Sequence, residues 1–214
     1  MSRAKGLAGR AAGRILPAVG KLLYDLPFGT ETSTPVSHEE LGYVRGVRGN
    51  YWPIGWRTAK RIFESVPATP EDVFLDLGSG KGRAVLLAAG RPYKRVIGVE
   101  VSPELHRAAV RNRARSRRRV RCGAIELVNA DALDYAIPDD VTVAFLFNPF
   151  RGPIFESVAR RLAESAKRVP RTLTIVYANP QEEEALRAVG ARLVSRAGPE
   201  GEESRSHWVD VYRL

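Results

Sequence analysis

The feature that most constrains the fold is the stretch at residues 73–83, V-F-L-D-L-G-S-G-K-G-R. Its first five residues are apolar apart from one aspartate, which is typical of a strand buried on both faces of a parallel sheet. Glycines then occupy alternate positions, Gly78, Gly80 and Gly82, so the backbone can turn sharply and approach a ligand where any Cβ would collide. Residues 84–89 are predicted to form a helix whose first N–H groups point into this turn. Together the three parts predict a nucleotide-sized binding site.

The spacing of these glycines distinguishes three kinds of ligand site. A P-loop, G-x-x-x-x-G-K-[ST], would need a glycine at Leu75 and a Ser or Thr at Gly82, and neither is present. A dinucleotide site has G-x-G-x-x-G, whereas here the glycines alternate and Asp76 precedes the first of them by two residues. This D-x-G-x-G-x-G form resembles motif I of the class I S-adenosylmethionine-dependent methyltransferases. A glycine-rich turn that holds no ligand is the remaining alternative.

Acidic residues follow the next two predicted strands. Residues 95–100 form a second apolar strand that ends in Glu100, and a carboxylate there, about 20 residues past the glycines, can reach the ribose hydroxyls of an adenosine ligand. The third strand, residues 125–128, is followed by Asp131, which can accept a hydrogen bond from an adenine amino group. The backbone N–H of Ala132 can then meet a ring nitrogen. These positions predict an adenosine site.

The fourth predicted strand, residues 141–147, is almost wholly apolar, so we expect it at the centre of the sheet. Asn148, Pro149 and Phe150 follow it at the sheet edge where ligands bind. The trio resembles the [DNS]-P-P-[YF] motif of amino-methyltransferases, in which the Asn side chain and a backbone carbonyl accept hydrogen bonds from the target NH while the aromatic ring packs on it. One proline of that motif is missing here. The alternative is a strand-to-helix turn without a catalytic role.

Two aromatic residues, Tyr51 and Trp52, precede a predicted helix at residues 55–66. They can pack over a pocket, where an aromatic face attracts a sulfonium cation, and Tyr51 is the candidate for that position. Alternatively, they anchor the N-terminal segment in the core.

The resemblance to class I methyltransferases extends over residues 73–214. It implies an α/β fold, a three-layer Rossmann-like sheet of seven strands in the order 3-2-1-4-5-7-6, mostly parallel with an antiparallel last strand. Further strands are predicted at residues 172–177, 192–195 and 207–212, and helices at 153–168 and 181–189. The implied cofactor is S-adenosylmethionine, with S-adenosylhomocysteine as product. Carried over by position, its amino-acid end would lie on Asp76, Gly78, Ser79, Gly80 and Gly82, its ribose on Glu100 and its adenine on Asp131. Further cofactor-binding candidates are Val101, Ala132 and Asn148. The catalytic candidates are Asn148, Phe150 and Tyr51.

The domain boundary is predicted near residue 50. Residues 1–50 would form a helical and loop extension, a possible pocket lid, and residues 51–214 the S-adenosylmethionine-binding domain. Residues 1–28 have the pattern of an amphipathic helix interrupted at Pro17. We expect it to pack on the domain; a membrane-surface helix or an organelle address is the alternative.

The net charge of +10 suggests a nucleic-acid partner. However, only six of the 34 basic residues are lysine, so the excess is almost entirely arginine. A GC-rich coding sequence produces the same arginine excess without selection for binding. The densest run is on a helix expected to open at Ser102 and to pack through Leu105, Ala108, Ala109 and Val110. The arginines at residues 107–121 would then lie on its solvated face and the following turn, with a phosphate-binding patch as the alternative.

Composition excludes several other classes. A single cysteine, Cys122, and three scattered histidines predict no disulfide and no metal site. No apolar run reaches the ~20 residues of a membrane span, and no signal peptide is evident, so we expect a cytoplasmic protein.

The sequence therefore predicts a monomeric or weakly dimeric methyltransferase that modifies a nitrogen of a small metabolite or protein side chain. Alternatives are an RNA methyltransferase that uses the arginines, a nicotinamide-dependent oxidoreductase, and a non-catalytic binding domain. The sequence does not identify the methyl acceptor.

Overall fold

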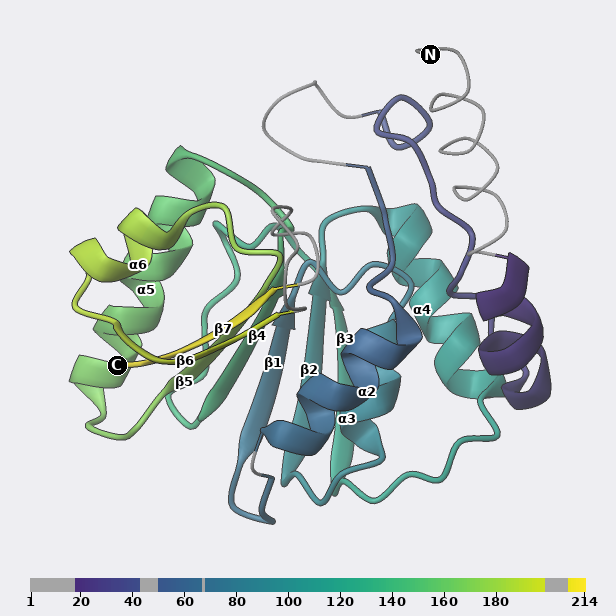
Figure 1. Ribbon diagram of the computed structural model, residues 1–214, viewed down its shortest axis with the longest axis horizontal. Coiled ribbons are helices and arrows are strands. Elements are labelled where there is room, and N and C mark those ends of the chain that lie inside the picture. The colour runs from purple at the N-terminus through teal and green to yellow at the C-terminus, as the bar shows by residue number, and fades with distance from the viewer. Residues whose placement is uncertain (1–17, 43–49, 67, 199–207) are drawn as a thin grey trace.

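The computed structural model describes residues 18–42, 50–66, 68–198 and 208–214, and a seven-stranded sheet lies between two layers of helices (Figure 1). The strand order β3-β2-β1-β4-β5-β7-β6 confirms the predicted topology. The strands are β1 (Val73–Leu77), β2 (Arg95–Glu100), β3 (Ala124–Asn129), β4 (Val143–Phe147), β5 (Thr174–Ala178), β6 (Arg192–Ala197) and β7 (Val209–Arg213). The helices of the two layers are α2 (Trp56–Ser65), α3 (Arg83–Ala89), α4 (Pro103–Arg115), α5 (Pro153–Arg168) and α6 (Glu183–Ala188).

Strand directions also agree with the prediction. The first five strands pair in parallel, and β7 is antiparallel to both of its neighbours, β5 and β6. The apolar strand β4 occupies the middle of the sheet. Because the parallel strands share one direction, the turns that follow β1, β2 and β4 all lie at the same edge of the sheet.

Strand β1 shows how the sequence divides the core between the two faces. Val73, Leu75 and Leu77 belong to the cluster that contains buried residues of α5 and α6, whereas Phe74 belongs to the cluster that contains α2 and α3. Alternate side chains of a strand point to opposite faces, so a run buried at every position requires helices on both sides. Figure 1 shows α5 and α6 on one side of the sheet and α2, α3 and α4 on the other.

Helix α4 buries Leu105 and Ala109 as predicted, but not Val110. Leu105, Ala109 and Asn112 are buried, while Val110 is 45% exposed, so its predicted packing is wrong. The buried residues follow one another at intervals of four and three, which places them on one helical face and Val110 outside it. Ser102 accepts a hydrogen bond from the Leu105 N–H at 3.2 Å, as expected of an N-cap.

The described part of the N-terminal extension begins as helix and continues as an irregular segment. Residues 18–20 are α-helical, followed by a π-helical turn at Lys21–Asp25 (η1) and a 3₁₀ turn at Leu26–Phe28 (η2). The expected interruption at Pro17 lies outside the described residues.

The N-terminal segment packs beside the end of α4. The Arg117 N–H donates to the Phe28 carbonyl at 2.9 Å, and the Arg118 guanidinium donates to the Tyr24 carbonyl at 2.7 Å. That guanidinium lies 3.8 Å from the centre of the Phe28 ring and 4.4 Å from that of Trp56. One of the arginines predicted to be solvated therefore anchors this segment instead.

A buried carboxylate, Asp25, organises the chain that follows it. It accepts hydrogen bonds from the Thr30 hydroxyl at 2.9 Å, the Thr32 hydroxyl at 2.8 Å and the Thr32 N–H at 3.0 Å. Burial alone would raise the pKa of Asp25, but hydrogen bonds from Ser33, Thr32 and Thr30 lower it overall. The ionised form is therefore favoured in the folded protein, and its stabilising effect is lost as the pH falls through this lowered pKa.

We predict that Asp25→Ala will destabilise the protein by about 3 kcal/mol, because three buried donors lose their acceptor. The measurement is the free energy of unfolding from urea titration. Glu64→Ala is the control, since Glu64 pairs with Lys60 at 3.7 Å on the exposed surface of α2, and it should leave that free energy nearly unchanged. Equal effects of the two substitutions would contradict the structural role of Asp25.

Candidate active site

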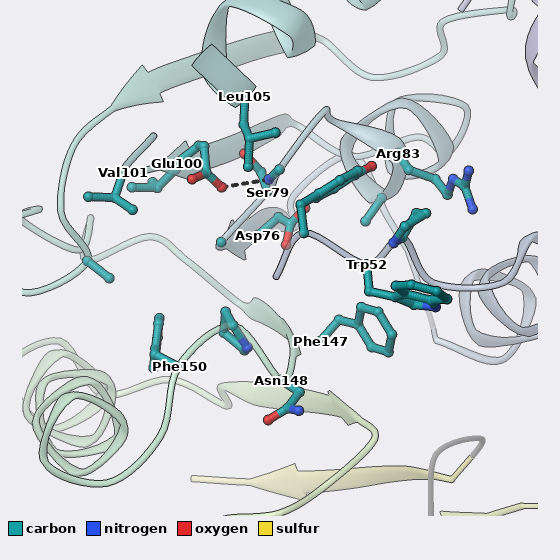
Figure 2. A pocket seen from close by; sticks show the side chains of 18 of the residues that line it. Trp52, Asp76, Ser79, Arg83, Glu100, Val101, Leu105, Phe147, Asn148 and Phe150 are labelled. Carbon is teal, nitrogen blue, oxygen red and sulfur yellow. Dashed lines mark hydrogen bonds between the residues drawn. The ribbon is translucent and has the colours of Figure 1, made fainter. Parts of the chain in front are cut away.

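A pocket lies at the sheet edge beyond β1, β2 and β4, and its walls come from both the sheet turns and the N-terminal extension. Most residues predicted for the site line it (Figure 2). They are Tyr51, Asp76, Gly78, Ser79, Gly80, Glu100, Val101, Asp131, Ala132, Asn148 and Phe150. Gly82 is the exception: it is the N-cap of α3 and does not appear among the lining residues.

The glycine loop requires its glycines for two reasons. Gly78, Gly80 and Gly82 all have positive φ, at 85°, 55° and 84°. A Cβ on Gly78 would overlap the Pro149 side chain, and one on Gly80 would overlap the Tyr51 ring. The loop therefore brings its bare backbone against the turn after β4 on one side and against an aromatic ring on the other.

Glu100, at the end of β2, holds this loop in place. Its Oε2 accepts a hydrogen bond from the Gly80 N–H at 2.8 Å (Figure 2), and its Oε1 accepts one from the Ser102 N–H at 2.8 Å. The side chain is buried and lines the pocket. The carboxylate thus bridges two turns of the sheet edge, and ribose binding by it stays a prediction.

Asp76 lies beside Glu100, buried at the end of β1. Burial, and secondly the charge of Glu100, raises the pKa of Asp76 to about 8. In the cofactor-free protein Asp76 is therefore mostly protonated at neutral pH. A cationic group bound against it would restore the ionised form.

The loop after β3 is fixed by hydrogen bonds. Asp131 Oδ1 accepts from the Leu133 N–H at 3.0 Å, which closes a tight turn. The Arg161 guanidinium of α5 donates to the carbonyls of Ala132 and Leu133, both at 2.6 Å, and to that of Tyr135. The predicted adenine-binding positions thus lie on a rigid turn, and the contribution of Arg161 was not foreseen because it comes from a distant helix.

Tyr51 packs its ring on Gly80 and donates its hydroxyl to the Thr32 carbonyl at 2.8 Å. Its backbone pairs with Val36 in an isolated antiparallel bridge. Burial raises the pKa of Tyr51 above its ordinary value, so the phenol stays neutral. Its neighbour Trp52 is exposed at the pocket rim. Tyr51 therefore contributes an aromatic surface rather than a base.

Two cations of the motif, Lys81 and Arg83, attach the N-terminal extension to the glycine loop. Lys81 Nζ lies 2.8 Å from Glu31 Oε2 and donates to the Thr34 carbonyl at 2.9 Å. Arg83 donates to the hydroxyls of Thr32, at 2.9 Å, and Ser33, at 2.8 Å, and to the Ile54 carbonyl, at 2.5 Å. These roles could not be predicted from the sequence, because the partners lie about 30 to 50 residues away.

Asn148 lies across the pocket from Asp76 and Glu100 (Figure 2). It has a positive φ of 43°, and its Oδ1 is buried without a hydrogen-bond partner among the described residues. Phe150 is buried nearby and packs against Phe155 of α5. Sequence reasoning missed Phe147 and Leu105, which also line the pocket; their apolar character placed them only in the core.

Comparison with known proteins supports one interpretation of this arrangement. Residues 74–171 match the model of a methyltransferase domain family. This part of the chain is therefore similar to a methyltransferase domain. No curated protein matches the chain.

Solved structures of similar fold belong to diverse proteins. An RNA methyltransferase from Salinibacter ruber, crystallised with S-adenosylhomocysteine, is 24% identical, with a TM-score of 0.51 over 75% of this chain and 91% of that one. A protein from Methanobacterium thermoautotrophicum titled precorrin 8w decarboxylase is 19% identical, with a TM-score of 0.55 over 80% and 95%. A TehB-like methyltransferase from Corynebacterium glutamicum is 17% identical, with a TM-score of 0.50 over 75% and 88%. At these identities the likeness establishes the fold.

The pocket fits S-adenosylmethionine. The glycine cradle admits a ligand where side chains would collide, and a carboxyl group, that of Asp76, lies in its wall. Glu100 and Asp131 add carboxylates to the same lining, and their binding of the ribose and adenine stays a prediction.

We predict that cofactor affinity will rise with pH from about 6 toward the Asp76 pKa of about 8, because the ligand's ammonium group requires an ionised carboxylate. Each pH unit below that pKa should raise the Kd by up to about tenfold, provided that the ammonium group of the ligand stays protonated. Titration calorimetry with S-adenosylhomocysteine in two buffers should also show proton release on binding.

Asp76→Asn gives the converse test. Folding raises the pKa of the Asp76 carboxyl group, so this group destabilises the folded state at any pH above its pKa in the unfolded chain. Asparagine removes that destabilisation. The substitution should therefore raise the Tm of the cofactor-free protein by roughly 3 °C or more at a pH above 8. It should also weaken binding and remove the pH dependence. Retention of that dependence would assign it to another group.

Proposed function

We propose that the enzyme transfers the methyl group of S-adenosylmethionine to a nitrogen of a small metabolite or of a protein side chain. The observation that carries this proposal is that Asn148 lines the pocket while its buried Oδ1 has no hydrogen-bond partner among the described residues. A buried acceptor without a donor costs on the order of 1–3 kcal/mol, and an N–H of the methyl acceptor would remove that cost. An amine or amide substrate supplies this donor.

The chemistry requires mainly that the acceptor be positioned. When bound, the cofactor supplies an electrophilic methyl group, so no strong base is needed beyond loss of the amine proton before or during transfer. Asn148 would orient the nitrogen by accepting its N–H, and Phe150 would pack against the acceptor. Tyr51 and the walls of the pocket would exclude water and hold the two reactants in line.

RNA is the second candidate acceptor. It is supported by a structural neighbour titled an RNA methyltransferase and by the arginines of α4, which can neutralise phosphates. An acceptor screen with radiolabelled cofactor should therefore include amines, proteins and RNA. An RNA acceptor would show activity that falls steeply with salt, whereas a small amine would not.

We predict that Asn148→Gly will lower kcat by at least about a hundredfold while leaving the Kd for S-adenosylhomocysteine within a few-fold of wild type. Glycine tolerates the positive φ, so the substitution removes the amide without adding backbone strain. The measurements are single-turnover methyl transfer and calorimetry.

Asn179→Gly is the matched control. Asn179 has a φ of 54°, directly follows β5 and precedes a proline, as Asn148 follows β4, but it does not line the pocket. It should retain wild-type kcat. Equal losses in the two variants would show that the Asn-Pro turn serves structure and would overturn the role of Asn148.

A further inference from the structure

Four large apolar side chains of the N-terminal segment are exposed to solvent. Val19 is 45% exposed, Leu22 63%, and Leu23 and Leu26 55% each. They form the leucine face of residues 18–28. The opposite side of the segment packs inward, since Asp25 is buried and Tyr24 stacks on Trp56 at 5.3 Å. The segment is therefore fixed to the domain through one side while its apolar side chains on the other side stay exposed.

An arginine-rich surface lies beside the segment that carries the leucine face. The end of α4 and the turn after it lie directly beside residues 24–28, joined to them through the Phe28 and Tyr24 carbonyls (Figure 1). This neighbouring surface, the arginine face, consists of the exposed side chains Arg107, Arg111, Arg115, Arg117, Arg119 and Arg121. Glu104 is the only acid among residues 101–123, and residues 18–24 hold one lysine and no acid.

Composition alone does not account for this surface. The chain has 28 arginines in 214 residues, and eight of them fall within the 15 residues 107–121. A codon bias would spread them evenly along the chain. Elsewhere, surface arginines such as Arg95, Arg168 and Arg196 are paired with carboxylates, whereas no ion pair within the described residues involves the arginine face.

We propose that the leucine face and the arginine face together bind the surface of an anionic lipid bilayer. An apolar helical face inserts among acyl chains at the interface, and flanking arginines attract the negative headgroups. Both faces are used in this arrangement. An RNA backbone would pair with the arginines but would leave the four apolar side chains in water. No helix among the described residues is long and apolar enough to cross a membrane, so the association is peripheral.

The test is co-sedimentation of the full-length protein with vesicles of phosphatidylcholine alone and of phosphatidylcholine and phosphatidylglycerol in a two-to-one ratio. Wild-type protein should bind the anionic vesicles at least about tenfold more tightly. Leu22→Ser with Leu23→Ser should weaken that binding by roughly tenfold or more, because two apolar side chains no longer insert. Arg115→Gln, Arg117→Gln and Arg119→Gln together should weaken it by roughly a hundredfold.

Matched controls separate location from composition. Leu193→Ser with Val194→Ser removes two exposed apolar side chains from β6. This strand is at one edge of the sheet, and α4 contacts β3 at the other edge. Arg160→Gln, Arg192→Gln and Arg213→Gln remove the same charge from other exposed positions. Both controls should bind anionic vesicles as wild type does, and every variant should keep its affinity for S-adenosylhomocysteine, which reports a folded site.

Three outcomes would overturn the proposal. One is absence of binding to anionic vesicles, and another is equal loss in the test and control variants. The third is binding to single-stranded RNA that depends on the arginine face and not on the leucine face, without vesicle binding; this result would assign the surface to RNA.

Discussion

Two buried cations belong to the glycine loop and its end: Lys81 lies within the loop, and Arg83 begins α3. Leaving a buried charge unpaired costs on the order of several kcal/mol. Their partners are Glu31, three side-chain or backbone oxygens of residues 32–34, and the Ile54 carbonyl. All of them come from the chain that precedes β1. The glycine loop is therefore stable only with this chain in place, and the same chain carries Tyr51 onto Gly80.

The two buried carboxyl groups of the site, Asp76 and Glu100, also cost stability, and they differ in how that cost is met. Glu100 is satisfied by two backbone N–H groups, whereas Asp76 is buried next to that charge and has its pKa raised to about 8. A site prepared for a cationic ligand is thus less stable when empty than one with a neutral residue at Asp76. The free energy spent on holding the carboxyl group there returns when an ammonium group binds, which couples cofactor binding to release of a proton.

The strands could be predicted because each is an apolar run followed by a turn, which is a local pattern. The same holds for pocket residues that follow strands directly, such as Asp76 and Glu100. The order of the strands in the sheet followed from the resemblance to class I methyltransferases. The partners of Lys81 and Arg161 could not be predicted, because a charged residue gives no sign of which distant oxygen it will meet. Val110 was misplaced for a related reason, since the polar Asn112 occupies the buried stripe and bonds to the Lys81 and Glu31 carbonyls.

The two Asn-Pro turns show why a motif alone does not define a role. Asn148 and Asn179 each follow a strand in a left-handed conformation that asparagine tolerates better than most residues. The side chain of Asn179 is occupied, since its Oδ1 accepts from Gln181 at 3.1 Å. Asn148 lines the cofactor pocket, and its Oδ1 is buried without a hydrogen-bond partner among the described residues. The turn explains the residue type at both positions, and only the unsatisfied acceptor distinguishes the one proposed to hold a substrate.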